Sequence, residues 1–273
     1  MRRWMKAAAV AALMGGLAAC GGGAEMASVT VPTVNDVSPA EWERLRQQRF
    51  FFGHQSVGAD VLNGVADVLK ARPELGLRVV ETTDTAQMRV PGLYHAKVGR
   101  NGEPQSKLDE FVRLAGAGVA DSGTAMLKYC YIDITGETNP DSLFESYRKA
   151  VDALRASNPG LRIVHLTLPL QKDWGTVQHL YVTIKGGRTT HRELNWIRQR
   201  YNERLRATYG GKEPVFDIAL LESIGPDGKQ RTARFRGERV PVLADEWTYD
   251  GGHLNEVGRR RVGEAFLATL AKL

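Results

Sequence analysis

The sequence predicts an α/β fold: a three-layer α/β/α sandwich around a mostly parallel sheet of about five strands. Predicted strands alternate with predicted helices along most of the chain, which is typical of a parallel sheet covered by helix layers. The stretch 125–134 is nearly all apolar, as expected for a central strand that is buried on both faces, and 161–168 is read as a further buried strand. The roughly 235 residues that follow the N-terminal segment are enough for one sizeable core.

The N-terminal segment is expected to lie outside this fold. A basic start precedes an apolar run at 7–19 that is too short to span a bilayer comfortably. The run ends in Leu-Ala-Ala-Cys, which resembles a bacterial lipobox and implies that Cys20 becomes the lipidated first residue; an ordinary secretory signal is the alternative. We therefore expect a signal peptide at 1–19, a flexible tether at 20–37 and one domain at 38–273, anchored by lipid to a membrane of the bacterial cell envelope, on the periplasmic or outer-membrane side.

The number of cysteines and the net charge argue against several classes of protein. Cys20 and Cys130 are the only cysteines, so no disulfide framework or cysteine metal cluster is possible, and Cys130 is expected in a buried strand. Removing the three basic residues of the N-terminal segment from the 37 in the chain leaves 34 against 31 acidic ones. This weak, dispersed charge does not predict nucleic-acid binding, which requires a clustered basic patch.

Capping residues and apolar spacing define the helices. Ser38 and Glu41 form a capping box, with Pro39 at the first helical position. The stretches 57–70 and 141–156 carry apolar residues at intervals of three and four, which indicates amphipathic helices.

Strands are identified by short apolar or aromatic runs. The first is aromatic (49–53), and the third, at 125–134, is nearly all apolar apart from Lys128. The stretches 83–105 and 169–190 lack periodicity and are predicted to be loops that form the walls of a cleft. In chain order the sequence predicts a helix from 38, strand 49–53, helix 57–70, strand 77–82, helix 106–114, strand 125–134, helix 141–156, strand 161–168, helix 191–209, strand 215–218 and helix 256–273.

Three residues combine into a candidate catalytic group. Ser56 lies where the first predicted strand meets the next helix, and side chains at the carboxyl ends of parallel strands face the ligand crevice. A serine there can equally cap the helix. Asp250 and His253 are three residues apart, so one turn can hold the carboxylate beside the imidazole, which activates a serine. Together they predict a serine hydrolase or acyltransferase.

The same residues carry a resemblance to a known family. The stretch Asp250-Gly251-Gly252-His253, just before a C-terminal helix, resembles the last sequence block of the SGNH/GDSL hydrolase superfamily. The resemblance covers about 48–273 in element order and implies that family's flavodoxin-like sandwich. The family's Gly-Asp-Ser is replaced here by Gly53-His54-Gln55-Ser56.

The resemblance also implies groups that bind the substrate or its oxyanion. Gly99 best matches the glycine of the family's second block. For the asparagine of the third block, Asn139 preserves the residue type and Asp133 preserves the position, and the choice stays open. An ionised Asp133 would repel an oxyanion, so it would have to be protonated or orient another donor. His54 would contribute to the pocket, or would be a turn histidine bonded to the backbone.

The expected function is therefore an ester hydrolase that removes acetyl or short acyl groups from a carbohydrate or another ester. The alternatives are an O-acetyltransferase acting on envelope or external polysaccharide, and an inactive binding lipoprotein of the same fold. No cofactor is expected. No metal is expected either, because the sequence has no His-x-x-x-His or cysteine-rich spacing.

Overall fold

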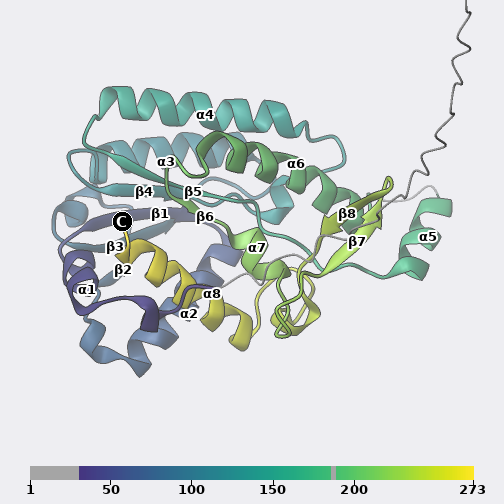
Figure 1. Cartoon of the computed structure of the whole chain (residues 1–273). Coiled ribbons are helices and arrows are strands. Elements are labelled where there is room, and N and C mark those ends of the chain that lie inside the picture. Colours follow the sequence, from purple (N-terminus) through teal and green to yellow (C-terminus); the bar gives the residue numbers. More distant parts are fainter. Residues whose placement is uncertain (1–30, 186–188) are drawn as a thin grey trace, which may run out of the picture.

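A six-stranded parallel sheet forms the centre of the molecule (Figure 1). The computed structural model describes residues 31–185 and 189–273, so the predicted signal peptide and Cys20 lie outside the described residues. The strand order is β2-β3-β1-β4-β5-β6, and a separate antiparallel hairpin consists of β7 and β8. The predicted α/β sandwich is confirmed, with six sheet strands where about five were expected.

The elements have the following bounds. The strands are β1 (Arg49–His54), β2 (Val79–Glu81), β3 (Gly92–Lys97), β4 (Thr124–Leu127), β5 (Arg162–Leu166), β6 (Val215–Phe216), β7 (Thr232–Phe235) and β8 (Glu238–Pro241). The α-helices are α1 (Pro39–Arg46), α2 (Ser56–Ala71), α3 (Pro104–Gly118), α4 (Pro140–Ser157), α5 (Thr176–Ile184), α6 (His191–Tyr209), α7 (Ile218–Ser223) and α8 (Glu256–Ala271). None of the helices in these two described ranges is long and apolar enough to cross a bilayer.

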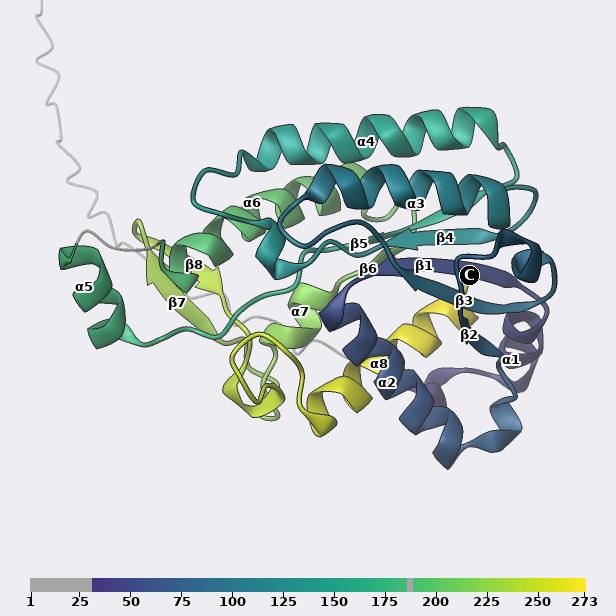
Figure 2. The same cartoon turned by 180° about the vertical axis from the view of Figure 1, so that it is seen from behind.

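Alternating side chains of the sheet build two cores, one on each face. In β1, Phe50 and Phe52 belong to the core beneath α1, α2 and α8, whereas Phe51 belongs to the core beneath α3, α4 and α6. Figures 1 and 2 show these two helix layers on opposite sides of the sheet. The aromatic run at the first strand is therefore buried on both faces, as a central parallel strand requires.

The chain changes direction across the sheet between β1 and β4. From β1 it enters α2 on one face, and from β4 it enters α4 on the other face. The carboxyl ends of two such strands leave a crevice between them, which is where parallel α/β sheets bind their ligands. Ser56 begins α2 at this point, and residues 128–135 follow β4.

Two stretches that were predicted to be loops contain a strand or a helix, and one predicted strand is shorter than expected. The stretch 83–105 contains β3, which pairs with both β1 and β2 inside the sheet. The run 125–134 is strand only to Leu127; its remainder is a buried loop with a 3-10 turn at Tyr131–Asp133, and Cys130 is buried in that loop rather than in a strand. The stretch 169–190 includes the helix α5.

A buried ion pair anchors the loop after β4. Lys107 Nζ, on α3, lies 2.6 and 2.7 Å from the two carboxylate oxygens of Asp133, and both side chains are fully buried. The Asp133 carboxylate also accepts hydrogen bonds from the amides of Cys130 and Gly102, at 2.7 and 3.0 Å. Because these four groups satisfy one another, the loop has a fixed position beside the switch point.

We predict that Lys107→Met lowers the free energy of unfolding by about 3–5 kcal/mol, because it leaves the Asp133 charge buried without its partner. Urea denaturation followed by circular dichroism measures the change. The matched control, Arg148→Met, breaks only the ion pairs of Arg148 with Glu145 and Asp152 at the surface and should leave the midpoint nearly unchanged. Equal effects of the two substitutions would show that the buried pair does not anchor the loop.

Candidate active site

Ser56 is the first residue of α2, and Gln55 occupies the capping position. The Gln55 side chain does not cap the helix, because its amide donates instead to the carbonyls of Val98 and Gly99, at 2.8 and 3.0 Å. The alternative that Ser56 is itself the helix cap is therefore wrong. Within the described part of the chain, the amides of residues 56–58 have no hydrogen-bond acceptor, so the positive end of α2 is open towards the crevice.

Asp250 and His253 are in direct contact. The Asp250 Oδ2 atom lies 2.6 Å from His253 Nδ1, and its Oδ1 atom accepts hydrogen bonds from the amides of Gly252 and His253, at 2.9 and 2.8 Å. Partial burial raises the pKa of Asp250, but the bonds from the His253 amide and ring outweigh it and lower that pKa overall. An ionised carboxylate beside Nδ1 accepts a hydrogen bond from the N–H at that position, so Nε2 is the nitrogen that carries no proton and can act as the base.

The loop that carries His253 is attached to α2. The Leu254 amide donates to the carboxylate of Asp60, one helical turn after Ser56, at 3.1 Å. Gly252 is packed against Tyr131, since a Cβ atom at this glycine would lie 2.9–3.1 Å from the tyrosine ring and hydroxyl. The first contact holds the C-terminal loop against the helix that begins with Ser56, and the second holds it against the loop after β4.

Two consecutive residues after β4 contact the serine and the histidine. The Cys130 Sγ atom is 3.7 Å from Ser56 Oγ, and the Tyr131 hydroxyl is 3.4 Å from Nε2 and 3.5 Å from Nδ1 of His253. No hydrogen bond joins Ser56 to His253 directly among residues 31–185 and 189–273. The structure thus brings the three predicted residues to one region, and the proton-transfer contact between Ser56 and His253 stays a prediction.

The residues predicted to bind the oxyanion have other contacts. The Gly99 amide donates to the Glu110 carboxylate at 2.6 Å, so it is not free to bind an oxyanion here. Asn139 is exposed and caps α4, where its side-chain oxygen accepts a hydrogen bond from the Ser142 amide at 3.0 Å. Asp133 is the buried partner of Lys107, and its bond to the Cys130 amide positions a residue that contacts Ser56. Whether Asp133 orients a donor to the oxyanion stays a prediction.

His54 is bonded to the backbone, as one of its two predicted readings requires. Its Nδ1 atom lies 2.9 Å from the Gln55 carbonyl, and its Nε2 atom lies 3.1 Å from Nδ1 of His95. Burial lowers the pKa of His54 to about 3 and also lowers the pKa of His95. Both rings are therefore neutral near pH 7, and each can donate one hydrogen bond in this chain of contacts.

Buried charged groups beneath the site were not assigned a role from the sequence. Lys128 directly follows β4 and is fully buried, and its Nζ atom has no partner among the described residues. Burial lowers its pKa and raises the pKa of the buried Glu222 to about 8. Arg198, also buried, donates to the Tyr131 carbonyl at 2.8 Å and so holds the residue that contacts His253. In the sequence, this cluster was indicated only by Lys128, a lysine within a largely apolar run.

A cavity of about 330 Å³ opens beside the Asp250 carboxylate. Trp174 and Tyr249 contribute aromatic rings to it, and both are exposed. The Tyr249 ring is nearly parallel to that of His253, with centroids 6.0 Å apart. The cavity therefore combines aromatic surface with one residue of the candidate site, Asp250.

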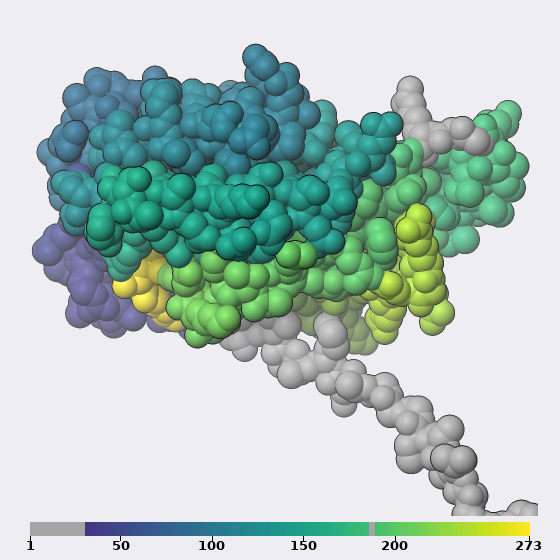
Figure 3. Space-filling view, turned by 90° about the horizontal axis from the view of Figure 1, so that it is seen from above, coloured from purple at the N-terminus to yellow at the C-terminus, as the bar shows by residue number. Residues whose placement is uncertain are grey.

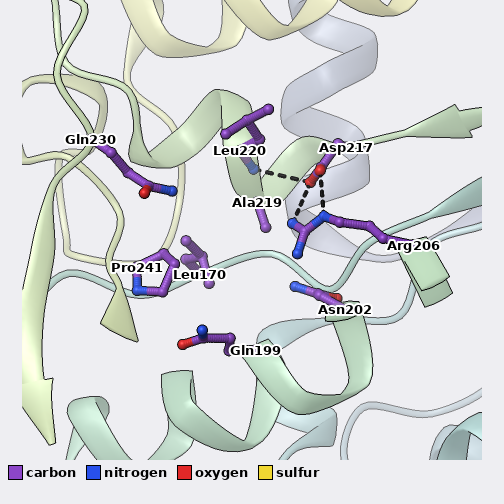
Figure 4. Close-up of a pocket in the computed structure, with 9 residues that line it drawn as sticks. All are labelled: Leu170, Gln199, Asn202, Arg206, Asp217, Ala219, Leu220, Gln230 and Pro241. Atoms are coloured by element: carbon purple, nitrogen blue, oxygen red, sulfur yellow. Dashed lines mark hydrogen bonds and ion pairs between the residues drawn. The ribbon is translucent and has the colours of Figure 1, made fainter. Parts of the chain in front are cut away.

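A second cavity, of about 320 Å³, lies between α6, α7 and the hairpin (Figure 4). Arg206 and Asp217 form a two-bond ion pair at its edge, with distances of 2.6 and 2.8 Å. None of the predicted site residues lines this cavity. Neither range described by the structure contains a group of three or more His, Cys, Asp or Glu side chains arranged to hold a metal ion.

Comparisons with known proteins give similarities of fold only. No protein-family model matches the sequence, and no curated protein matches it. Among solved structures, the chain is similar to a candidate platelet activating factor from Streptococcus pneumonia, with 12% identity, coverage of 85% of this chain and 91% of that one, and a TM-score of 0.47.

Two further structures have names that describe acyl chemistry. One is a peptidoglycan O-acetylesterase, with 18% identity, coverage of 65% of this chain and 45% of that one, and a TM-score of 0.41. The other is the periplasmic domain of a lipopolysaccharide acetyltransferase from Salmonella ser. Paratyphi A, with 10% identity, coverage of 80% and 81%, and a TM-score of 0.36. At these values neither protein's activity is transferred to this chain.

We predict that His54→Asn makes protein stability less dependent on pH in mildly acidic solution. Below pH 6.5 an unfolded histidine binds a proton that the folded His54, with its pKa of about 3, does not bind. Stability is therefore lost as the pH falls from 6.5 towards 3, by about 1.4 kcal/mol per pH unit for one such group. Urea unfolding of both proteins at pH 5.5 and 4.5 measures the two slopes. Identical slopes would mean that His54 is not held neutral by burial.

Proposed function

We propose that this protein is a serine ester hydrolase that removes acetyl or short acyl groups through Ser56, His253 and Asp250. The observation that carries the proposal is the 2.6 Å contact between Asp250 Oδ2 and His253 Nδ1, on a loop bonded to the helix that begins with Ser56. Their place at the crevice between β1 and β4 supports it, because ligands bind at this point of a parallel sheet.

In the proposed reaction, Ser56 Oγ attacks the ester carbonyl while its proton moves to His253 Nε2. Asp250 stabilises the imidazolium that forms. The tetrahedral intermediate collapses when the His253 proton passes to the leaving alcohol, which leaves an acyl group on Ser56. Water then attacks the acyl group and gives a proton to His253. When the second tetrahedral intermediate collapses, the bond between the acyl carbon and Ser56 Oγ breaks, Oγ takes that proton from His253, and the carboxylic acid is released. For the first step the Ser56 hydroxyl must approach Nε2, which now faces the Tyr131 hydroxyl at 3.4 Å.

The oxyanion would be held by the amides at the start of α2. They point from the open end of the helix dipole and need no side chain to be rearranged. This assignment replaces Gly99 and Asn139, whose contacts lie elsewhere.

The cavity beside Asp250 would seat the part of the substrate that does not react. Its aromatic rings, Trp174 and Tyr249, lie next to the polar groups of Lys172, His191 and Thr248. A sugar presents both polar hydroxyl groups and an apolar ring face, and this lining offers hydrogen-bonding groups and aromatic rings together. This mixture supports a carbohydrate ester as the substrate class.

Solvent exposure favours water as the acyl acceptor. The side chains of Asp250 and His253 are 41% and 23% exposed, so water reaches the proposed base. An O-acetyltransferase would use the same residues and pass the acyl group to a sugar hydroxyl. Free acetate as the only product, with a polysaccharide acceptor present, identifies the hydrolase, whereas acetylated sugar identifies the transferase.

We further propose that the protein is exported and anchored in the cell envelope by lipid on Cys20, through which it contacts a membrane. The support is the Leu-Ala-Ala-Cys sequence after an apolar run. This proposal is independent of the chemistry at Ser56.

We predict that Ser56→Ala lowers kcat/KM for short-chain acyl esters by about 10⁴-fold or more, because the nucleophile is lost. Release of acetate or of a chromogenic alcohol measures it, and a fluorophosphonate probe should label wild type at Ser56. The matched control, Ser142→Ala, removes a serine from the first turn of α4 and should retain full activity and labelling. Unchanged hydrolysis in Ser56→Ala would refute the mechanism, and an unlabelled wild type without esterase activity would instead favour an inactive binding protein.

We predict that Asp250→Asn lowers kcat by up to about 10⁴-fold with little change in KM, because an amide no longer holds the histidine in the required tautomer. The control is Asp245→Asn, a carboxylate on the same cavity that pairs with Lys172 at 3.0 Å. Initial rates across a range of substrate concentrations separate kcat from KM. Loss of activity in the control to the same extent would show that cavity charge, rather than the Asp250–His253 contact, supports the reaction.

A further inference from the structure

The outer face of α5 is an apolar stripe without a partner in the described chain. Val177, Leu180, Tyr181 and Ile184 follow one another at intervals of three, one and three residues, which places them on one face of the helix. Their exposed fractions are 84, 55, 58 and 74%, and α5 contains no buried residue. A surface helix normally turns such a stripe towards a core, so its exposure here calls for a binding partner.

The opposite face of α5 contacts the β7–β8 hairpin. The His179 ring lies edge-on to the Phe235 ring with centroids 6.2 Å apart, and Val182 on the same side is half-buried. Figures 1 and 2 both show α5 next to the hairpin at one end of the molecule, and Figure 3 shows this end projecting from the body. The apolar stripe therefore faces outwards from a convex end and does not line a cleft.

Exposed basic side chains lie on the hairpin, which contacts the other face of α5, and at the C-terminal end of α5. The hairpin carries Arg234, Arg236 and Arg239, and Lys185 directly follows α5; all four are exposed. The one acidic residue of the hairpin strands, Glu238, is already paired with Arg200 of α6. The end of the molecule that presents the stripe thus has an excess of positive charge.

We propose that α5 and the β7–β8 hairpin dock on the surface of an anionic lipid bilayer. The four apolar side chains of α5 enter the headgroup region, and the hairpin arginines pair with lipid phosphates. A short helix with an apolar face and neighbouring basic groups binds a membrane interface by both effects together. This inference does not depend on the chemistry at Ser56.

A bilayer fits this surface better than a second protein does. A stable protein interface buries about 800 Å² on each partner, which is far more than four side chains on one convex helix present. The excess of arginine matches the phosphates of a lipid surface. A flat bilayer can also contact a projecting end of the molecule without a complementary groove.

Docking would place the candidate active site close to the membrane. Trp174 lines the cavity beside Asp250, and α5 starts two residues later. The Lys172 amide donates to the Gly251 carbonyl at 2.8 Å, which joins this segment to the loop of Asp250 and His253. The proposal therefore predicts that esters at or near a lipid surface reach the site more readily than esters in bulk solution.

The test is hydrogen–deuterium exchange of the full chain with vesicles of phosphatidylglycerol and phosphatidylethanolamine, or of phosphatidylcholine alone. The readout is local to 176–184, since the apolar N-terminal run can itself bind lipid. We expect the α5 amides to exchange about tenfold more slowly with the anionic vesicles, and this protection to decrease in high salt. The double variant Val177→Asp/Ile184→Asp should lose it, and Arg234→Gln/Arg239→Gln should weaken it.

The control Val90→Asp/Val257→Asp introduces the same charges at two other exposed apolar residues and should keep the protection of α5. Ser56→Ala should also keep it, so that failure of the hydrolase proposal and failure of this one are separate results. The proposal is overturned if anionic vesicles leave α5 exchange unchanged, or if the control variant loses protection equally. Protection that rises with protein concentration in the absence of lipid would identify self-association instead and would also overturn it.

Discussion

The fixed position of the loop after β4 is the constraint on which the candidate site depends. Cys130 and Tyr131 of this loop contact Ser56 and His253, which are separated by almost two hundred residues of sequence. The loop is held from below by the buried Asp133–Lys107 pair and from the side by Arg198, which binds the Tyr131 carbonyl. A shift of this loop would change the positions of both contacts together.

The buried ionisable groups beneath the site are compatible with a folded core because burial shifts them towards their neutral forms. Lys128 and Glu222 are each displaced in this way, the lysine by a lowered pKa and the glutamic acid by a raised one. Burial also lowers the pKa of Arg198 to about 9. A buried charge without a partner is costly, and a shift of the pKa towards the neutral form reduces that cost. The cluster therefore supports the floor of the crevice without exposing it to solvent.

The layered fold was predictable from the sequence because its signals are local. The capping box at Ser38 and Glu41 forms as expected, and α6 spans His191–Tyr209 as predicted. By contrast, β3 was missed because only some of its positions are strongly apolar and it is flanked by stretches without periodicity. The end of β4 was misplaced for a different reason: five of the seven residues 128–134 are buried, and hydrophobicity does not distinguish a buried loop from a buried strand. α5 was missed although its apolar residues at 177, 180, 181 and 184 have helical spacing, because the helix has only nine residues and lies within a long stretch that otherwise lacks periodicity.

The candidate site was predictable only where its residues are neighbours in sequence. The Asp250–His253 contact follows from a spacing of three residues, since one turn brings the two side chains together. The contacts of Gly99 and Asn139 depend on partners that spacing does not reveal: a glutamate on α3 and the first turn of α4. The role of Tyr131 was likewise hidden, because it requires both the turn after β4 and the close approach of Gly252.

The hydroxyl group of Tyr131 is the group that contacts the imidazole of His253 from the loop after β4. Burial raises its pKa to about 12, so it keeps its proton at neutral pH and can donate it towards His253 Nε2. The hydroxyl lies almost equally far from both ring nitrogens of His253, 3.5 Å from Nδ1 and 3.4 Å from Nε2, so an approach of Ser56 to Nε2 would take place beside it.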